Sequence, residues 1–92
     1  MGLSMGLAAC AGAPVQEMSN ARQAIKAARD ATGAATTRPP SLIEAETLLN
    51  RAEDNLQKRA YKQARRDAIA ARGKAAEALS STRTVDDRNG AG

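Results

Sequence analysis

The stretch SLIEAETLLNRAEDNLQKRAYKQARRDAIAARGKAAEAL, residues 41–79, decides the fold of this chain, because its apolar residues recur at helical spacing. In the first half, intervals of three and four residues separate Leu42, Ala45, Leu49, Ala52 and Leu56. In the second half, the same intervals separate Tyr61, Ala64, Ala68, Ala71, Ala75 and Ala78. This spacing places the apolar side chains on one face of an α-helix. We therefore predict two amphipathic helices, one over residues 41–58 and one over residues 61–80.

A polar run, Gln57-Lys58-Arg59, lies between the two predicted helices. Leu56 and Tyr61 are five residues apart, so a continuous helix would bring the two apolar faces out of register. We favour a tight turn near residues 58–60, which folds the helices into an antiparallel hairpin, over the alternative of one long helix. The charges agree, because residues 41–58 carry four acidic and two basic side chains, whereas residues 59–81 carry six basic and two acidic ones.

The start of the hairpin has a local signal of its own. Ser41-Leu42-Ile43-Glu44 fits a capping box, in which the hydroxyl of Ser41 accepts a hydrogen bond from the amide of Glu44 and the carboxylate of Glu44 accepts one from the amide of Ser41. The preceding pair Pro39-Pro40 cannot continue a helix that comes before it. We therefore predict a loop over residues 33–40 and a helix start at Ser41.

A further helix is predicted before this loop, over residues 14–32. Pro14 suits the first helical position, and apolar residues follow at helical intervals at Val15, Met18, Ala21, Ile25 and Ala28. Residues 81–92 show no apolar periodicity, which predicts a disordered tail. The predicted fold class is all-α: an antiparallel three-helix assembly, or a helical hairpin with a looser first helix, over residues 14–80.

The composition argues against catalytic chemistry. The 92 residues include no His, Trp or Phe, one Cys and one Tyr. Zinc sites and Ser-His-Asp or Cys-His catalytic sets need His or Cys side chains as ligands or bases. Among the carboxylates, Glu44 and Glu46 are two residues apart and do not share a helix face. We predict a protein that is not an enzyme and uses no cofactor or metal.

The first nine residues are apolar and rich in Gly, Ala and Leu, and they lead into Leu7-Ala8-Ala9-Cys10. This ending resembles the lipobox of bacterial lipoprotein signal peptides. The resemblance implies cleavage before Cys10, diacylation of its sulfur and acylation of the new amine. Residues 1–9 would then be the remainder of a signal peptide, and residues 10–13 a linker that carries the lipid on Cys10. Ala11 stands where Asp directs retention in the inner membrane, which implies an outer-membrane anchor facing the periplasm.

No Lys or Arg precedes Arg22, although a secretory signal carries basic residues ahead of its apolar stretch. Two interpretations stay open. Either the true start lies upstream and Met1 is internal, or the segment is an ordinary Ala-rich end with an inert Cys10 thiol. No stretch of the sequence approaches the roughly 20 apolar residues that span a bilayer.

The pattern over about residues 7–80 resembles the bacterial lipoprotein domain-of-unknown-function family 4398. The resemblance rests on the lipobox at Cys10, an Ala-rich first helix, the pattern Leu-x-x-Ala-x-x-x-Leu-x-x-Ala from Leu42, and Tyr61-Lys62-Gln63-Ala64 after the turn. It implies a helical lipoprotein of the bacterial cell envelope. The predicted function is a non-enzymatic, membrane-tethered structural or interaction scaffold in the periplasm.

Arg59, Lys62 and Arg66 form a candidate patch for an anionic surface. On a helical wheel they lie opposite the apolar seam, where they could meet anionic lipid or lipopolysaccharide; a merely solvated face is the alternative. Other candidate partners are a further envelope protein and a second copy of the chain.

Four more charged residues are candidates for aligning the hairpin. Glu46 and Glu53 flank one edge of the apolar face of residues 41–58. Arg65 and Arg72 flank the matching edge of the apolar face of residues 61–80. Folding at the turn would pair Glu53 with Arg65 or Arg66, and Glu46 with Arg72.

The alternative function is a small basic cytosolic helical protein that binds nucleic acid or a partner helix. The formal net charge of +4 permits it. The lack of aromatic stacking residues weighs against nucleic acid.

Overall fold

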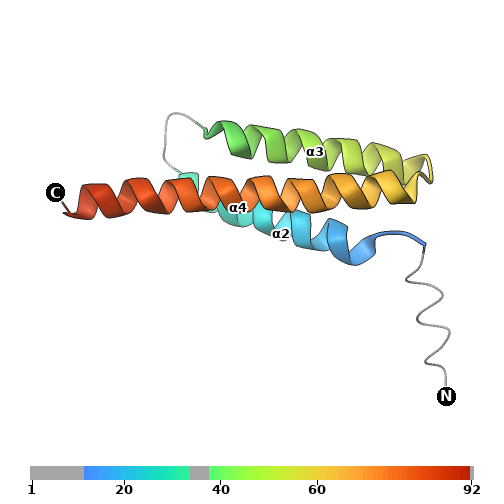
Figure 1. Cartoon of the computed structure of the whole chain (residues 1–92), viewed down its shortest axis with the longest axis horizontal. Coiled ribbons are helices and arrows are strands. Elements are labelled where there is room, and N and C mark those ends of the chain that lie inside the picture. Colours follow the sequence, from blue (N-terminus) through green and yellow to red (C-terminus); the bar gives the residue numbers. More distant parts are fainter. Residues whose placement is uncertain (1–11, 34–37, 92) are drawn as a thin grey trace, which may run out of the picture.

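The computed structural model describes residues 12–33 and 38–91, and the side chains among them as far as Thr82. These residues form three α-helices and no strand: α2 (Val15–Thr32), α3 (Pro40–Gln57) and α4 (Tyr61–Ala91). Helix α3 runs antiparallel to the other two, so α2 and α4 point in the same direction (Figure 1). The predicted all-α antiparallel three-helix assembly is confirmed, and so is the turn at residues 58–60.

Helix α4 is the centre of the assembly. It packs most extensively against α3, less against α2, and the direct contact between α2 and α3 is slight. Its inward face is almost entirely alanine, and Ala64, Ala68, Ala71, Ala75 and Ala78 are all fully buried. Because alanine is small, the neighbouring helices can lie close to α4 on two sides. The predicted hairpin with a looser first helix describes this packing correctly.

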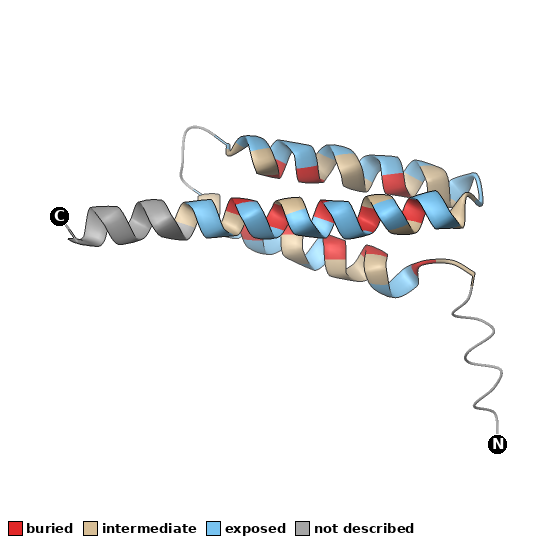
Figure 2. Ribbon diagram, viewed as in Figure 1, coloured by how far each residue is buried: buried red, intermediate tan, exposed pale blue. Residues whose placement is uncertain are grey.

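The few large buried side chains come mainly from the other two helices. The largest fully buried ones are Met18 and Ile25 of α2, Leu42 of α3, and Pro14. Leu49, which the seam places on the same face as Leu42, is only partly buried at the edge of the core. The buried parts of α2 and α3 lie on the sides turned toward α4 (Figure 2).

The helix starts differ from the sequence predictions. Helix α3 begins at Pro40 with Pro39 at the N-cap, and no side chain caps it, so the predicted capping box at Ser41 and Glu44 is wrong. The fixed φ of proline and its missing N–H suit the first position of a helix, and this start replaces the one at Ser41. Helix α3 thus begins one residue earlier than predicted. Helix α2 begins one residue later than predicted, at Val15, because Pro14 is its N-cap.

Helix α4 extends to Ala91, beyond the predicted helix end at residue 80. Between Gly73 and Gly90 the sequence has no glycine, and it has no proline after Pro40. Nothing in this part of the chain therefore breaks the backbone ladder, although the apolar periodicity has ended. The last turns of α4 extend beyond the ends of α2 and α3 (Figure 1).

Candidate anion-binding surface

The turn between α3 and α4 is a Schellman motif. Helix α3 ends at Gln57 with Lys58 at the C-cap. The backbone N–H of Ala60 donates to the carbonyl of Asn55 at 2.8 Å, and the N–H of Arg59 donates to the carbonyl of Leu56 at 3.0 Å. These two bonds satisfy carbonyls at the helix end that have no partner inside the helix. The turn therefore reverses the chain within three residues and brings the start of α4 beside the end of α3.

Arg59 holds this turn with a left-handed backbone, at φ 62°. Glycine is the usual residue at that position, because a side chain costs energy in this conformation. The arginine side chain is exposed at the end of the hairpin.

Four basic side chains gather near the turn, and we call them the basic tip: Arg51, Arg59, Lys62 and Arg66. All four are exposed, and none takes part in an ion pair or hydrogen bond within the described part of the chain. Of the other basic side chains described, only Arg72 also lacks an ion pair. Among the described side chains, unpaired positive charge is thus concentrated near the turn between α3 and α4.

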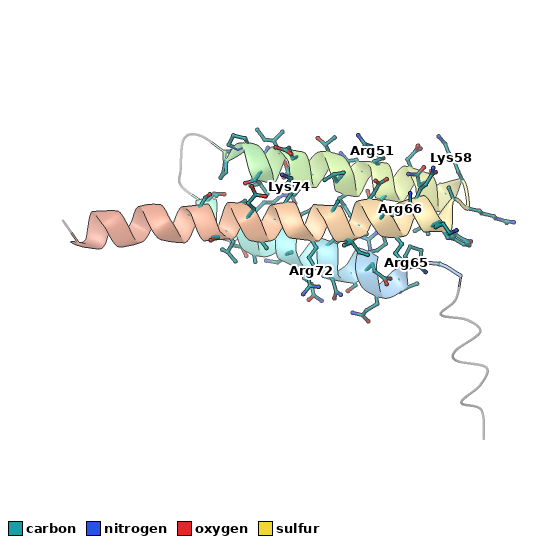
Figure 3. All side chains as sticks on the ribbon, viewed as in Figure 1. Arg51, Lys58, Arg65, Arg66, Arg72 and Lys74 are labelled. Atoms are coloured by element: carbon teal, nitrogen blue, oxygen red, sulfur yellow. The ribbon has the colours of Figure 1, made fainter. Side chains whose placement is uncertain are left out.

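A shallow groove between α3 and α4 belongs to this end. It has a volume of about 340 Å³ and is lined by Arg51, Asn55, Gln63, Arg66 and Asp67. Figure 3 shows Arg51 and Arg66 on the same side of the hairpin, with Lys58 nearby. The groove places two guanidinium groups and two side-chain amides where one anion could reach them.

The acidic side chains near the basic tip already have partners. The carboxylate of Asp67 accepts a hydrogen bond from the amide Nδ2 of Asn55 at 2.9 Å, and Asp54 pairs with Lys58 at 2.9 Å. Glu53 pairs with Arg22 of α2 at 3.3 Å. Asp54 and Glu53 are therefore neutralised by cations outside the basic tip, whereas Asp67 keeps its negative charge beside Arg66.

The sequence predicted three of these four residues. Arg59, Lys62 and Arg66 are exposed, away from the alanine seam of α4, as the helical wheel indicated. Arg51 was missed. The antiparallel register of the hairpin could have located it. With a turn at residues 58–60, Arg51 lies seven residues before Lys58 and therefore comes opposite Arg66.

The predicted ion pairs across the hairpin are wrong. Glu46 pairs with Arg29 of α2 at 2.7 Å and with Arg38, and not with Arg72. Glu53 pairs with Arg22, and not with Arg65 or Arg66. Both carboxylates therefore tie α3 to α2, where the direct helix contact is slight.

Arg65 and Arg72 lie along the other edge of α4, beside α2 (Figure 3). Arg65 pairs with Glu17 of α2 at 3.6 Å. The ion pair that does cross from α4 to α3 is made by Lys74, with Glu44 at 3.5 Å. Lys74 also approaches Glu77 at 3.4 Å, and the pKa of its ammonium group is raised above its ordinary value, mainly by the charge of Glu44 and then by Glu77.

Cys10 and residues 1–9 lie outside the described residues, and so does Ala11. The chain is attached to the bundle from Gly12 onward. The Gly12 carbonyl accepts a hydrogen bond from the guanidinium of Arg65 at 3.3 Å, the Ala13 carbonyl accepts one from Val15 N–H at 2.9 Å, and Pro14 is fully buried. Residues 12–14 are thereby held against the start of α4.

The described residues contain no group of three or more metal-ligating side chains arranged to hold a metal ion. In the same part of the chain, no helix has the length and apolar character needed to cross a bilayer. Comparisons with family models, with curated proteins and with solved structures found no match to this chain.

Proposed function

We propose that this chain is a lipoprotein of the bacterial cell envelope, tethered through Cys10 to the outer membrane and facing the periplasm. In this proposal the three-helix assembly is a non-enzymatic scaffold, and its exposed surfaces bind other envelope components. The resemblance to the lipoprotein family 4398 supports it, through the lipobox and the Leu and Ala spacing of α3 and α4.

One observation carries the proposal: Gly12, two residues after Cys10, is already bonded to the helical assembly. From Gly12 the backbone is bonded to Arg65, and Pro14 is buried. A lipoprotein cut before Cys10 would therefore begin with its lipid-bearing residue and pass directly into its folded domain. Nothing of residues 12–82 would be lost by such cleavage.

Acylation of Cys10 is the test of this proposal. We expect labelled palmitate to enter the wild-type chain, expressed in a Gram-negative host with its own upstream DNA, and not the Cys10→Ala variant. Cys10→Ala should keep the helical circular dichroism of the wild type, because the described fold begins after it. Equal labelling of both chains, or none in either, would contradict the tether.

The basic tip favours a second candidate function, binding to nucleic acid in the cytosol. Positive charge alone supports such binding without sequence preference. Single strands, however, are usually also held by aromatic stacking, and the one aromatic residue, Tyr61, is half-buried. We therefore place this function second.

A further inference from the structure

The N-terminal attachment and the basic tip lie at the same end of the molecule. Arg65, in the first turns of α4, contacts both Gly12 and Glu17, so the start of α2 lies beside the start of α4. The turn at residues 58–60 leads directly into α4. Figure 1 shows the start of α2 and this turn at one end, and the end of α4 at the other.

Covalent geometry extends this placement to Cys10. Two residues span at most about 7 Å of extended chain, so Cys10 cannot lie far from Gly12. A membrane that holds a lipid on Cys10 would therefore lie close to the end of the bundle that carries the basic tip. The charge of a surface acts over a distance of roughly 8 Å at physiological salt, which is comparable to this reach.

We propose that the basic tip binds the phosphates of anionic lipid headgroups in the membrane that carries the tether. This inference rests on the proposed function, because the lipid on Cys10 is what brings that membrane to this end. The hairpin turn then faces the bilayer, and the end of α4 at Ala91 points away from it. The several acyl chains that the lipobox resemblance implies would hold the protein at the membrane by themselves, and the contact of the basic tip would set the orientation of the bundle on the bilayer.

The groove between α3 and α4 fits a phosphate in charge and in donors. Arginine binds phosphate through paired N–H donors, and Arg51 and Arg66 approach the groove from its two helices. Asn55 and Gln63 add amide groups to the lining. The one acidic lining residue, Asp67, accepts a hydrogen bond from the neutral amide of Asn55 and keeps its negative charge, so the two guanidinium groups would have to outweigh it.

The basic tip has no evident role inside the fold. Lys62 and Arg66 are like charges four residues apart on one helix, which disfavours the helix slightly. All but one of the other described basic side chains has an acidic partner, many of them between helices. Neutralising the basic tip should therefore leave the fold intact, and a loss of binding in such variants would report on the surface itself.

The test measures binding of the full-length, unacylated Cys10→Ser chain to vesicles made of equal parts phosphatidylglycerol and phosphatidylcholine. We expect binding that weakens as salt is raised, and little binding to pure phosphatidylcholine. Each charge near such a surface contributes about fivefold in affinity, so Arg51→Gln with Arg66→Gln should weaken binding by tenfold or more. The matched control, Lys26→Gln with Arg72→Gln, removes the same net charge elsewhere and should weaken it less than about threefold.

A second measurement reports which end meets the membrane. Tyr61 is the only Tyr in a chain without Trp, and it begins α4 beside the turn. A lipid with a spin label on its headgroup should quench Tyr61 fluorescence when the Cys10→Ser chain binds. The quenching should fall when the same chain also carries Arg51→Gln and Arg66→Gln, which we call the groove variant.

Three outcomes would overturn the proposal. The first is no salt-sensitive binding of the Cys10→Ser chain to the anionic vesicles. The second is equal weakening by the groove variant and by its control, which would reduce the effect to net charge. The third is tighter, groove-dependent binding to a DNA duplex than to the vesicles. Because these chains carry no lipid, the results are independent of palmitate labelling, so the surface and the tether can fail separately.

Discussion

Arg59 occupies a backbone conformation that glycine adopts at no steric cost, and it does so at the turn that sets the register of the hairpin. For an L-residue, the left-handed conformation costs about 1 to 2 kcal/mol. The side chain makes no ion pair or hydrogen bond with the described residues that would offset this cost. An arginine here is thus unfavourable for the fold, and the proposed headgroup contact gives it a use.

Arg59→Gly should therefore stabilise the protein while weakening its binding to anionic vesicles. Glycine removes the steric cost but adds about 0.4 to 1 kcal/mol of unfolded-state entropy, so we expect a net gain of roughly 0.5 to 1 kcal/mol in the free energy of unfolding. Urea denaturation followed by circular dichroism measures it. Arg59→Ala is the control, because it removes the same charge and keeps the Cβ, and it should show no such gain. A gain of equal size in both variants would mean that the stability came from removing the charge, and not from relieving the backbone strain.

At the scale of the helix, the alanine seam of α4 fixes how closely α2 and α3 approach it. Ala68 is fully buried in the core, whereas Ala70, two residues along, is exposed. The two positions share a helix and a residue type, and they differ in burial. The same substitution at the two positions therefore distinguishes an effect on close packing from an effect on helix propensity.

Ala68→Leu should destabilise the protein by about 1 to 3 kcal/mol, because a larger side chain forces the packed helices apart. Ala70→Leu adds the same atoms in solvent and should change stability by less than about 0.5 kcal/mol. Thermal melts of the two variants, followed at 222 nm (the usual helical signal), measure the difference. Equal melting temperatures would show that the seam tolerates larger residues and that the helices are not in close contact.

How far the sequence predicts these elements depends on the kind of signal. Apolar spacing around Leu42 and around Ala68 predicts two helices, because it fixes the buried face of each. The five-residue step from Leu56 to Tyr61 predicts the turn between them. The ion pairs of Glu46 and Glu53 with α2 could not be predicted in this way. They depend on which edge of α4 faces α2, and that edge is set by the hand of the whole assembly.

The starts of helices were predicted less well, since two local signals competed at adjacent positions. Ser41 and Pro40 both suit a helix start, and spacing alone does not rank them. The end of α4 was missed for a related reason: apolar periodicity reports packing against a neighbour, whereas a helix continues until a residue breaks its ladder. The groove residue Arg51 required the hairpin register before it could be placed beside Arg66.

At the scale of the whole molecule, α2 contributes more to the core than its packing suggests. Its contact with the hairpin is less extensive than the contact between α3 and α4. Yet Met18 and Ile25 are two of the largest fully buried side chains, whereas the buried residues of the hairpin are alanines and Leu42. The ion pairs that link α2 to α3 and α4 are partly exposed, and such pairs each contribute only about 0.2 to 1 kcal/mol. Burial of α2 side chains should therefore stabilise all three helices together.

Ile25→Ala tests this coupling. Loss of a buried isoleucine should cost about 2 to 5 kcal/mol, comparable to the roughly 3 to 5 kcal/mol that a small single core supplies. We expect amide hydrogen exchange to accelerate in α3 and α4 as well as in α2, because the alanine-rich hairpin alone buries few large side chains. Val15→Ala is the control, since Val15 is 72% exposed in the same helix and its loss should leave exchange nearly unchanged. If exchange accelerated in α2 alone, the hairpin would be an independent folding unit, and the basic tip would not need α2 to stay folded.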